Sequence, residues 1–196
     1  MLKRMRRLFG KPATASTAVV TAPTEPPRAD SPALAETFVM PFEIRPMIDT
    51  DGPALRELFR QSIQQIASKY YEADAIAAWS ASADDDEFVS RLQRGLTVVA
   101  LLHGEAVGFA QLYPADHIEM MYLSPQGSGL GIATLLCQHL EDEARIAGSR
   151  TLTTASSLAA RRFFESMGFR VSSEETVQRN GVAINRLQME KVLMGG

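Results

Sequence analysis

The sequence predicts an α/β fold of the mixed α+β kind, in which a central antiparallel or mixed sheet of six to seven strands is flanked by helices. Two observations predict this class. Short strand-like runs occur along the chain in groups of one, three, one and two, and segments of helical period separate the groups. The connections within the group of three are too short for a parallel crossover, so these strands should be antiparallel.

The first strand is predicted at the segment FEIRP, which begins at Phe42. Residues 49–53 then supply both a helix cap and a proline suited to a first helical turn. Apolar side chains at three- and four-residue steps mark one buried face of a helix that ends near Tyr71. They are Leu55, Leu58, Phe59, Ile63, Ile66 and Tyr70. Two shorter helices are expected at residues 73–79 and 84–93.

The rest of the chain is expected to hold six strands and two helices. The strands are predicted at residues 96–102, 106–113, 117–123 and 150–155, and as a final pair joined at Asn180-Gly181. The first helix has apolar period from Ile132 to Ala147 and ends at Gly148. The second spans residues 158–167 and ends at Gly168, because glycine is the usual residue just beyond a helix.

The sequence predicts a tail at residues 1–40 and a single domain at residues 41–196. The tail has four basic side chains within its first seven residues and is then rich in Ala, Thr and Pro. Such a composition cannot form a packed core, so we expect disorder. Its charge also leaves an organelle-targeting or membrane-surface segment open, and the natural start at Met40 is a further alternative.

Composition excludes several classes of function. No run approaches the roughly 20 apolar residues of a membrane-spanning helix, so no membrane span is expected. The single cysteine, Cys137, excludes an internal disulfide and a site of several zinc thiolates, and fits a reducing compartment such as the cytoplasm. The three histidines lack a second ligand at helical or hairpin spacing, so no metal is expected. Residues 40–196 carry 14 basic and 20 acidic side chains, which argues against nucleic-acid binding.

The most informative segment, residues 122–133, runs from a predicted strand through three spaced glycines into a predicted helix. Gly127, Gly129 and Gly131 let the backbone approach a ligand closely and adopt positive φ. Free N–H groups at the start of the helix, together with the helix dipole, form a site suited to a pyrophosphate. The dinucleotide fingerprint fails because its third glycine position is Ile132, and the lysine of a phosphate loop is absent.

Two motifs resemble the GNAT superfamily of N-acetyltransferases. The segment from Gln126 to Gly131, QGSGLG, is similar to the family signature Q/R-x-x-G-x-G/A. The segment from Ala160 to Phe169, ARRFFESMGF, is similar to its second signature, A-x-x-x-Y-x-x-x-G-F. The resemblance covers roughly residues 42–193 and is greatest to little-characterised bacterial members.

The resemblance implies a GNAT-like fold and the transfer of an acetyl group from acetyl-CoA to a primary amine of a small molecule or protein. It also implies that the pantetheine arm of the co-substrate enters between two splayed strands. The residues that the resemblance assigns to CoA are Met121, Tyr122, Leu123, Gln126, Gly127, Ser128, Gly129, Leu130, Gly131, Ile132, Ala133, Ser157 and Phe164. We also consider a homodimer.

The resemblance places a candidate general base, Glu119, on the strand before the first signature. Strand alternation puts His117, Glu119 and Met121 on one face, which makes His117 a second candidate. The alternative is that Glu119 is a solvent-facing position of an amphipathic strand. Phe164 stands where the family usually has a tyrosine that protonates the thiolate, so Tyr122 or water must supply that proton.

The acceptor pocket is expected between the early helices and the final hairpin. Tyr70, Tyr71 and Trp79 are candidates to line it, although aromatic residues at helical spacing are also typical of a core. Because Phe164 cannot donate a proton, a second function remains open, namely an acyl-CoA sensor that binds the thioester without turning it over.

Overall fold

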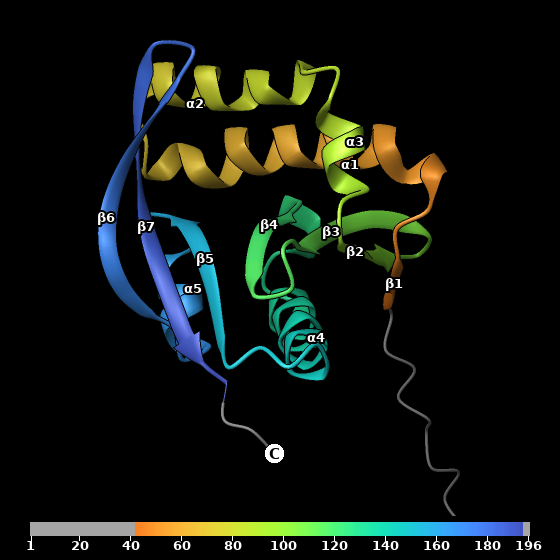
Figure 1. The fold of residues 1–196 in the computed structure, drawn as a ribbon. Helices are drawn as coiled ribbons and strands as arrows, with labels where there is room; N and C mark the ends of the chain where they lie inside the picture. Colours follow the sequence, from red (N-terminus) through yellow and green to blue (C-terminus); the bar gives the residue numbers. More distant parts are fainter. Residues whose placement is uncertain (1–41, 194–196) are drawn as a thin grey trace, which may run out of the picture. The chain divides into compact units, whose positions relative to one another are not determined.

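A computed structural model describes residues 42–193 of the chain, and Figure 1 shows its fold. The seven strands form one sheet in the order β1-β2-β3-β4-β5-β7-β6. They are β1 (Phe42–Pro46), β2 (Leu96–Leu102), β3 (Glu105–Leu112), β4 (His117–Leu123), β5 (Thr151–Ser157), β6 (Arg170–Arg179) and β7 (Val182–Val192). This confirms the predicted class, a mixed sheet flanked by helices. The predictions for the tail lie outside the described residues.

All neighbouring strands are antiparallel except β4 and β5. These two run parallel and pair only where His117 meets Thr153 and Ile118 meets Thr154. Beyond that point they diverge, as the family resemblance implies, and a gap between the strands is visible in Figure 1. The sheet is therefore split into a half that contains β1 to β4 and a half that contains β5 to β7.

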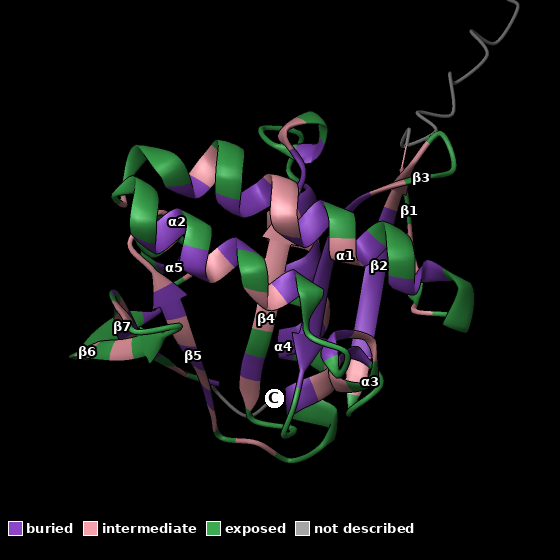
Figure 2. Cartoon of the chain, turned by 90° about the horizontal axis from the view of Figure 1, so that it is seen from above, coloured by how far each residue is buried: buried purple, intermediate pink, exposed green. Residues whose placement is uncertain are grey.

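Helices cover both faces of the sheet. They are α1 (Gly52–Gln61), α2 (Ala73–Ser80), α3 (Phe88–Leu92), α4 (Ile132–Ile146) and α5 (Arg161–Ser166). One apolar cluster joins α4 and α5 to one face of the sheet, and the other joins the three early helices to the opposite face. Successive side chains of a strand point to opposite faces of the sheet, so Val98 packs in the first cluster and Val99 in the second. Figure 2 shows that the outer sides of α1 and α2 are exposed.

The predicted helix that ends near Tyr71 is less regular than its apolar period indicates. After α1 the chain continues as a π-helical segment, Ser62–Ile66, and then a 3-10 turn, Ala67–Lys69. The predicted helix at residues 84–93 is also shorter, because a 3-10 turn ends at Asp84 and α3 begins only at Phe88. Within the described part of the chain, no helix is both long and apolar enough to cross a membrane.

A buried ion pair ties the two sheet halves together through α4. Glu141 on α4 is 4% exposed, and its Oε1 accepts a hydrogen bond from Lys191 Nζ on β7 at 2.6 Å. Arg145 Nη2 approaches the other oxygen of Glu141 at 3.3 Å. A buried carboxylate requires such partners, because an unpaired charge is very costly to remove from water.

Candidate functional site

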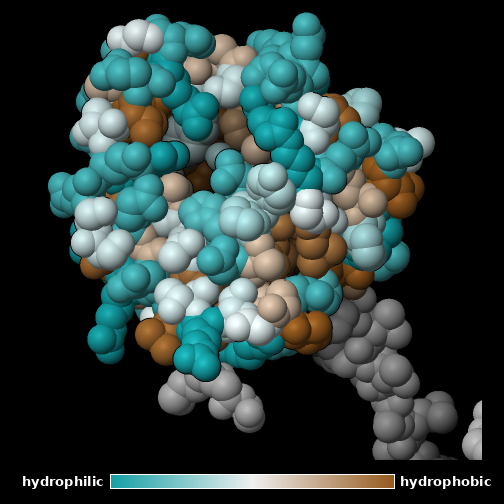
Figure 3. Space-filling model, in the orientation of Figure 1, coloured by the Kyte–Doolittle hydropathy of each residue, from teal (hydrophilic) through white to brown (hydrophobic). Residues whose placement is uncertain are grey.

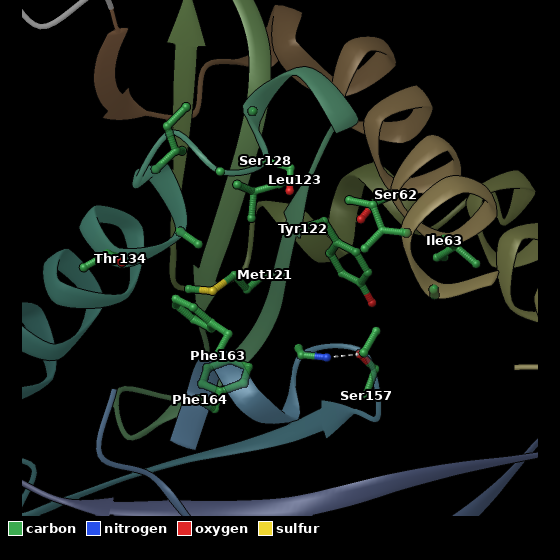
Figure 4. A pocket seen from close by; sticks show the side chains of 18 of the residues that line it. Ser62, Ile63, Met121, Tyr122, Leu123, Ser128, Thr134, Ser157, Phe163 and Phe164 are labelled. Atoms are coloured by element: carbon green, nitrogen blue, oxygen red, sulfur yellow. Dashed lines mark hydrogen bonds between the residues drawn. The ribbon is translucent and has the colours of Figure 1, made fainter. Parts of the chain in front are cut away.

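A cavity of about 360 Å³ lies where β4 and β5 diverge. Most of its lining comes from the π-helical segment after α1, the end of β4, the glycine turn with the start of α4, and the link from β5 into α5, and Trp79 adds a contact from α2. We call it the cofactor cleft. Figure 4 shows Phe163 and Phe164 close to Met121, and Tyr122 between Ser62 and Ser157.

The glycine turn is held in place by local contacts. A 3-10 turn, Pro125–Gly127, follows β4, and the N–H of Gly127 donates to the carbonyl and hydroxyl oxygens of Ser124 at 3.0 and 3.3 Å. Gly127 lies so close to β3 that a Cβ there would overlap the carbonyl oxygen of Val107. Only glycine therefore fits at this position without displacing the backbone.

Backbone N–H groups gather where the turn enters α4. Gly129 and Gly131 have φ of 80° and 78°, and Gly131 is the N-cap of the helix without a side-chain cap. Within residues 42–193, the N–H groups of residues 129–134 have no hydrogen-bond acceptor. These donors, at the positive end of the 15-residue helix α4, are suited to bind a phosphate or diphosphate.

Most residues that the sequence assigns to CoA line the cofactor cleft. They are Met121, Tyr122, Leu123, Gly127, Ser128, Gly129, Gly131, Ile132, Ala133, Ser157 and Phe164. Gln126 and Leu130 are exposed and do not line it. Thr134, Phe163 and the π-helical residues Ser62 and Ile63 line the cleft but were not predicted. The helical period of the apolar residues predicted that Ile63 lies on a buried helix face. No pattern in the neighbouring sequence indicates that the same face also borders a cleft.

The simple alternation predicted for β4 is wrong at Glu119. Gln111 pairs with Met120 whereas the next residue, Leu112, pairs with Ile118, so Glu119 is an extra residue opposite β3. Such a bulge changes which face the following side chains point to. Ile118 and Met121 consequently share the α4 side of the sheet, while Met120 and Tyr122 lie on the α1 side.

The bulge places Glu119 beside His117 at the edge of a second cavity. His117 Nε2 lies 3.6 Å from Glu119 Oε2, and His117 Nδ1 lies 2.8 Å from Thr153 Oγ1. Thr153 donates its hydroxyl proton to the carbonyl oxygen of Asp116 at 3.1 Å, so the Nδ1 of His117 must carry the proton that Thr153 accepts. In a neutral ring, Nε2 is then left as a proton acceptor next to the Glu119 carboxylate.

This second cavity, of about 450 Å³, is lined mainly by α1, α2, α3, β4, the end of β5 and the β6–β7 hairpin. We call it the acceptor cavity. A small cavity of about 50 Å³ lies between it and the cofactor cleft, and Trp79, Tyr122 and Ser157 line all three. Figure 3 shows one face of the molecule, with a hollow that has hydrophobic residues at its bottom and hydrophilic residues around its rim.

Aromatic side chains form the wall between the two spaces. Tyr122 stacks on Phe109 with a centroid distance of 5.5 Å and meets Trp79 edge-on at 6.4 Å. Burial raises the pKa of the Tyr122 phenol to about 12. Of the three aromatic candidates for the acceptor pocket, Tyr71 and Trp79 line this cavity, but Tyr70 is 53% exposed and does not.

Tyr71 also links the two halves of the molecule. Its hydroxyl donates to the carbonyl oxygen of Asn185 on β7 and accepts from the N–H of Leu158, both at 2.8 Å. Next to it, Ser157 Oγ accepts a hydrogen bond from the N–H of Ala160 at 3.2 Å, which leaves its own proton free to donate.

Across residues 42–193, no group of three or more His, Cys, Asp or Glu side chains could hold a metal ion.

Comparison with known proteins identifies the family. A family model described as "Acetyltransferase (GNAT) domain" matches residues 67–193. An uncharacterized N-acetyltransferase of Escherichia coli, YafP, is 26% identical over 148 residues, which are 76% of this chain and 94% of the relative.

Two solved structures share the fold. A GCN5-related N-acetyltransferase from Rhodopseudomonas palustris has a TM-score of 0.75 and 35% identity, over 77% of this chain and 95% of its own. The PaiA N-acetyltransferase of Thermoplasma acidophilum, solved in complex with coenzyme A, has a TM-score of 0.62 and 20% identity, over 77% of this chain and 98% of its own. With the glycine turn, the split sheet and the family match on one chain, this protein belongs to the GNAT family of N-acetyltransferases.

Proposed function

We propose that this protein transfers an acetyl group from acetyl-CoA to a primary amine of a small molecule or peptide. The observation that carries the proposal is the row of free N–H groups at residues 129–134. These groups lie at the cofactor cleft, which shares lining residues with the cavities that Glu119 and His117 line. Acetyl-CoA would supply an activated acyl group as a thioester. The protein supplies binding, orientation and proton transfer.

The cofactor cleft fits a CoA thioester at three levels. The N–H groups of residues 129–134 can bind the diphosphate. Beyond Ile118, the edge of β4 has no pairing with β5, so its backbone groups are free to pair with the amides of the pantetheine arm. The N–H of Met121 or Tyr122 can then donate to the thioester oxygen as negative charge develops on it.

Glu119 and His117 are the candidate bases. An ammonium must lose a proton before its nitrogen can attack a carbonyl carbon, and a carboxylate or an unprotonated imidazole nitrogen accepts that proton. Glu119 Oε2 and His117 Nε2 lie 3.6 Å apart and both residues line the acceptor cavity. An amine nitrogen that lies beside both atoms, off the line that joins them, can reach both acceptors at hydrogen-bond distance.

Tyr122 is the candidate proton donor to the departing thiolate. Phe164 lines the cleft but has no proton to donate. Tyr122 lines the same cleft, and its raised pKa of about 12 keeps the phenol protonated at neutral pH. Since a free thiol titrates near ~8.5, water can serve instead of the phenol.

A non-catalytic acyl-CoA sensor is the second candidate function. It is favoured by Phe164, which is 3% exposed and stands at the position where the family usually has its acid. Release of free CoA thiol from acetyl-CoA, measured with a panel of primary amines, separates the two. Amine-dependent release supports transfer, whereas saturable acetyl-CoA binding with no release for any amine supports the sensor.

We further propose that the enzyme acts in the cytoplasm. The support is the single cysteine, Cys137, which is buried and has no cysteine partner anywhere in the sequence. Assembly as a homodimer stays a prediction.

A further inference from the structure

Three arginines and one carboxylate line the acceptor cavity. The arginines come one each from α3, β6 and β7 and are Arg91, Arg179 and Arg186. Glu119 is the only carboxylate among the lining residues. An arginine attracts an anionic ligand most strongly where no carboxylate already neutralises it, so the partners of the three arginines decide which of them is available.

Two of these arginines are neutralised by partners outside the cavity lining. Arg91 Nη1 pairs with Asp85 Oδ2 at 2.5 Å, and Arg186 Nε pairs with Glu175 Oε2 at 2.6 Å. Each therefore brings its own counter-ion, and their net contribution to the field in the cavity is small.

Arg179 differs from the other two. It is the last residue of β6, directly before the Asn180-Gly181 turn, whose φ values are 49° and 79°. Among residues 42–193 its guanidinium has neither an ion-pair partner nor a hydrogen-bond acceptor. Its charge also acts on the Tyr122 phenol, where it opposes the larger effect of burial on the pKa of that group.

We propose that the acceptor amine of this enzyme carries an anionic group, a carboxylate or a phosphate, and that Arg179 binds it. The proposal rests on the proposed function. A guanidinium offers a planar fork of donors that matches both anions, and such charge-assisted bonds are about twice as strong as neutral ones. The diphosphate of CoA is a poor candidate for this site, because Arg179 does not line the cofactor cleft.

The residues of the acceptor cavity then have separate tasks. Glu119 and His117 accept the proton from the ammonium. Arg179 holds the anion, while the amine nitrogen reaches the space that Tyr122 and Ser157 share with the cofactor cleft. A diamine would instead bring a second positive charge next to an unpaired arginine, which is unfavourable.

Matched acceptors test the proposal. Release of CoA thiol is measured with each of the standard amino acids beside its carboxamide, with phosphoethanolamine beside ethanolamine, and with 1,4-diaminobutane. The members of a pair differ in the anion. A carboxamide also lowers the pKa of the neighbouring ammonium and makes the amine easier to deprotonate, so the amino acid comparison is biased against the proposal. We expect kcat/KM to be about tenfold or more higher for the anionic member of at least one pair.

The variant Arg179→Gln and a matched control test whether Arg179 causes the preference for the anionic acceptor. For the preferred anionic acceptor, Arg179→Gln should raise KM about tenfold and leave kcat within about twofold, with no change in KM for its uncharged partner. The control is Arg170→Gln, an exposed arginine at the other end of the same strand that lines neither cavity and should change neither constant.

The possible outcomes are distinct. Preference for uncharged amines or the diamine, or an equal effect of Arg179→Gln on both members of a pair, overturns the anion proposal but leaves acetyl transfer intact. If no amine releases CoA thiol while acetyl-CoA binds, the proposed function fails and the anion proposal fails with it.

Discussion

Glu119 owes its position to a single extra residue in β4. The bulge turns its side chain toward the acceptor cavity, beside His117 and close to the point where the cofactor cleft begins. A carboxylate there has no arginine or lysine partner among the described residues, so it is available to a ligand. The Glu119 side chain is 49% exposed, which fits both a catalytic base and an ordinary solvent-facing residue of a strand. Mutation separates these two roles.

Replacing Glu119 by Gln tests its role as a base. An amide cannot accept the ammonium proton, so kcat should fall by about 10²-fold or more, while the dissociation constant for acetyl-CoA changes by less than about twofold. Steady-state kinetics and calorimetric titration measure the two quantities. Glu105→Gln, at an exposed hairpin position, is the control and should leave both unchanged. Unchanged turnover in Glu119→Gln would dismiss the base.

Cys137 is excluded as an acyl-carrying nucleophile by its surroundings. It lies on α4 with 0% exposure, 3.8 Å from Glu141 Oε1, and burial together with that carboxylate raises the pKa of its thiol to about 12. At pH 8 almost none of it is thiolate, which is the reactive form. Ellman's reagent should therefore label the native protein at least about a hundredfold more slowly than the unfolded chain. Equal rates would show that the thiol is accessible.

At the scale of elements, the start of α4 is the feature on which function depends most. Gly131 has positive φ and open space where a Cβ would lie, so an alanine there meets backbone strain but no clash. Its N–H and those that follow belong to the free donors of the cofactor cleft. A small backbone rotation at this residue would therefore misalign several donors at once.

Gly131→Ala should weaken CoA binding about tenfold or more and destabilise the fold by about 1–2 kcal/mol. The matched control is Gly104→Ala in the β2–β3 turn, where φ is +85° and nothing lies within 4 Å of the added Cβ. Both variants bear the same backbone strain, so urea unfolding should show similar losses of stability. Only Gly131→Ala should change the dissociation constant for CoA; equal affinities in the two variants would contradict the assignment.

Sequence patterns predicted most elements because helical period and strand runs are local signals. They missed the π-helical segment at Ser62–Ile66 and the bulge at Glu119. Both depend on how a segment packs against another part of the chain, since a bulge exists only relative to the register of β3. These same two irregularities shape the cofactor cleft and the acceptor cavity, so the site was predicted less completely than the sheet.

At the scale of the molecule, the site exists because the two halves of the sheet are joined at one end and open at the other. Two residue pairs connect β4 to β5, the Glu141–Lys191 pair connects α4 to β7, and Tyr71 connects the early helices to β7. The motifs identified the glycine turn and Phe164, both of which line the cofactor cleft. The arginines of the acceptor cavity come from α3 and from the two strands of the β6–β7 hairpin, and they share no motif.

Lys191→Met should destabilise the protein by about 3 kcal/mol, because it leaves the buried Glu141 carboxylate with only the more distant Arg145. The double variant Glu141→Gln/Lys191→Met removes the stranded charge and should recover at least about half of that loss. Urea unfolding measures both. A single variant as stable as the wild type would show that the pair does not hold the two halves together.

The most direct test of the account is calorimetric titration of the wild-type protein with CoA and, separately, with pantetheine, which has the same arm but lacks the diphosphate and the adenosine 3′-phosphate attached to it. If the N–H groups of residues 129–134 bind the diphosphate, CoA should bind at least about a hundredfold more tightly than pantetheine. Equal affinities, or no association of CoA at about 1 mM, would contradict the central claim.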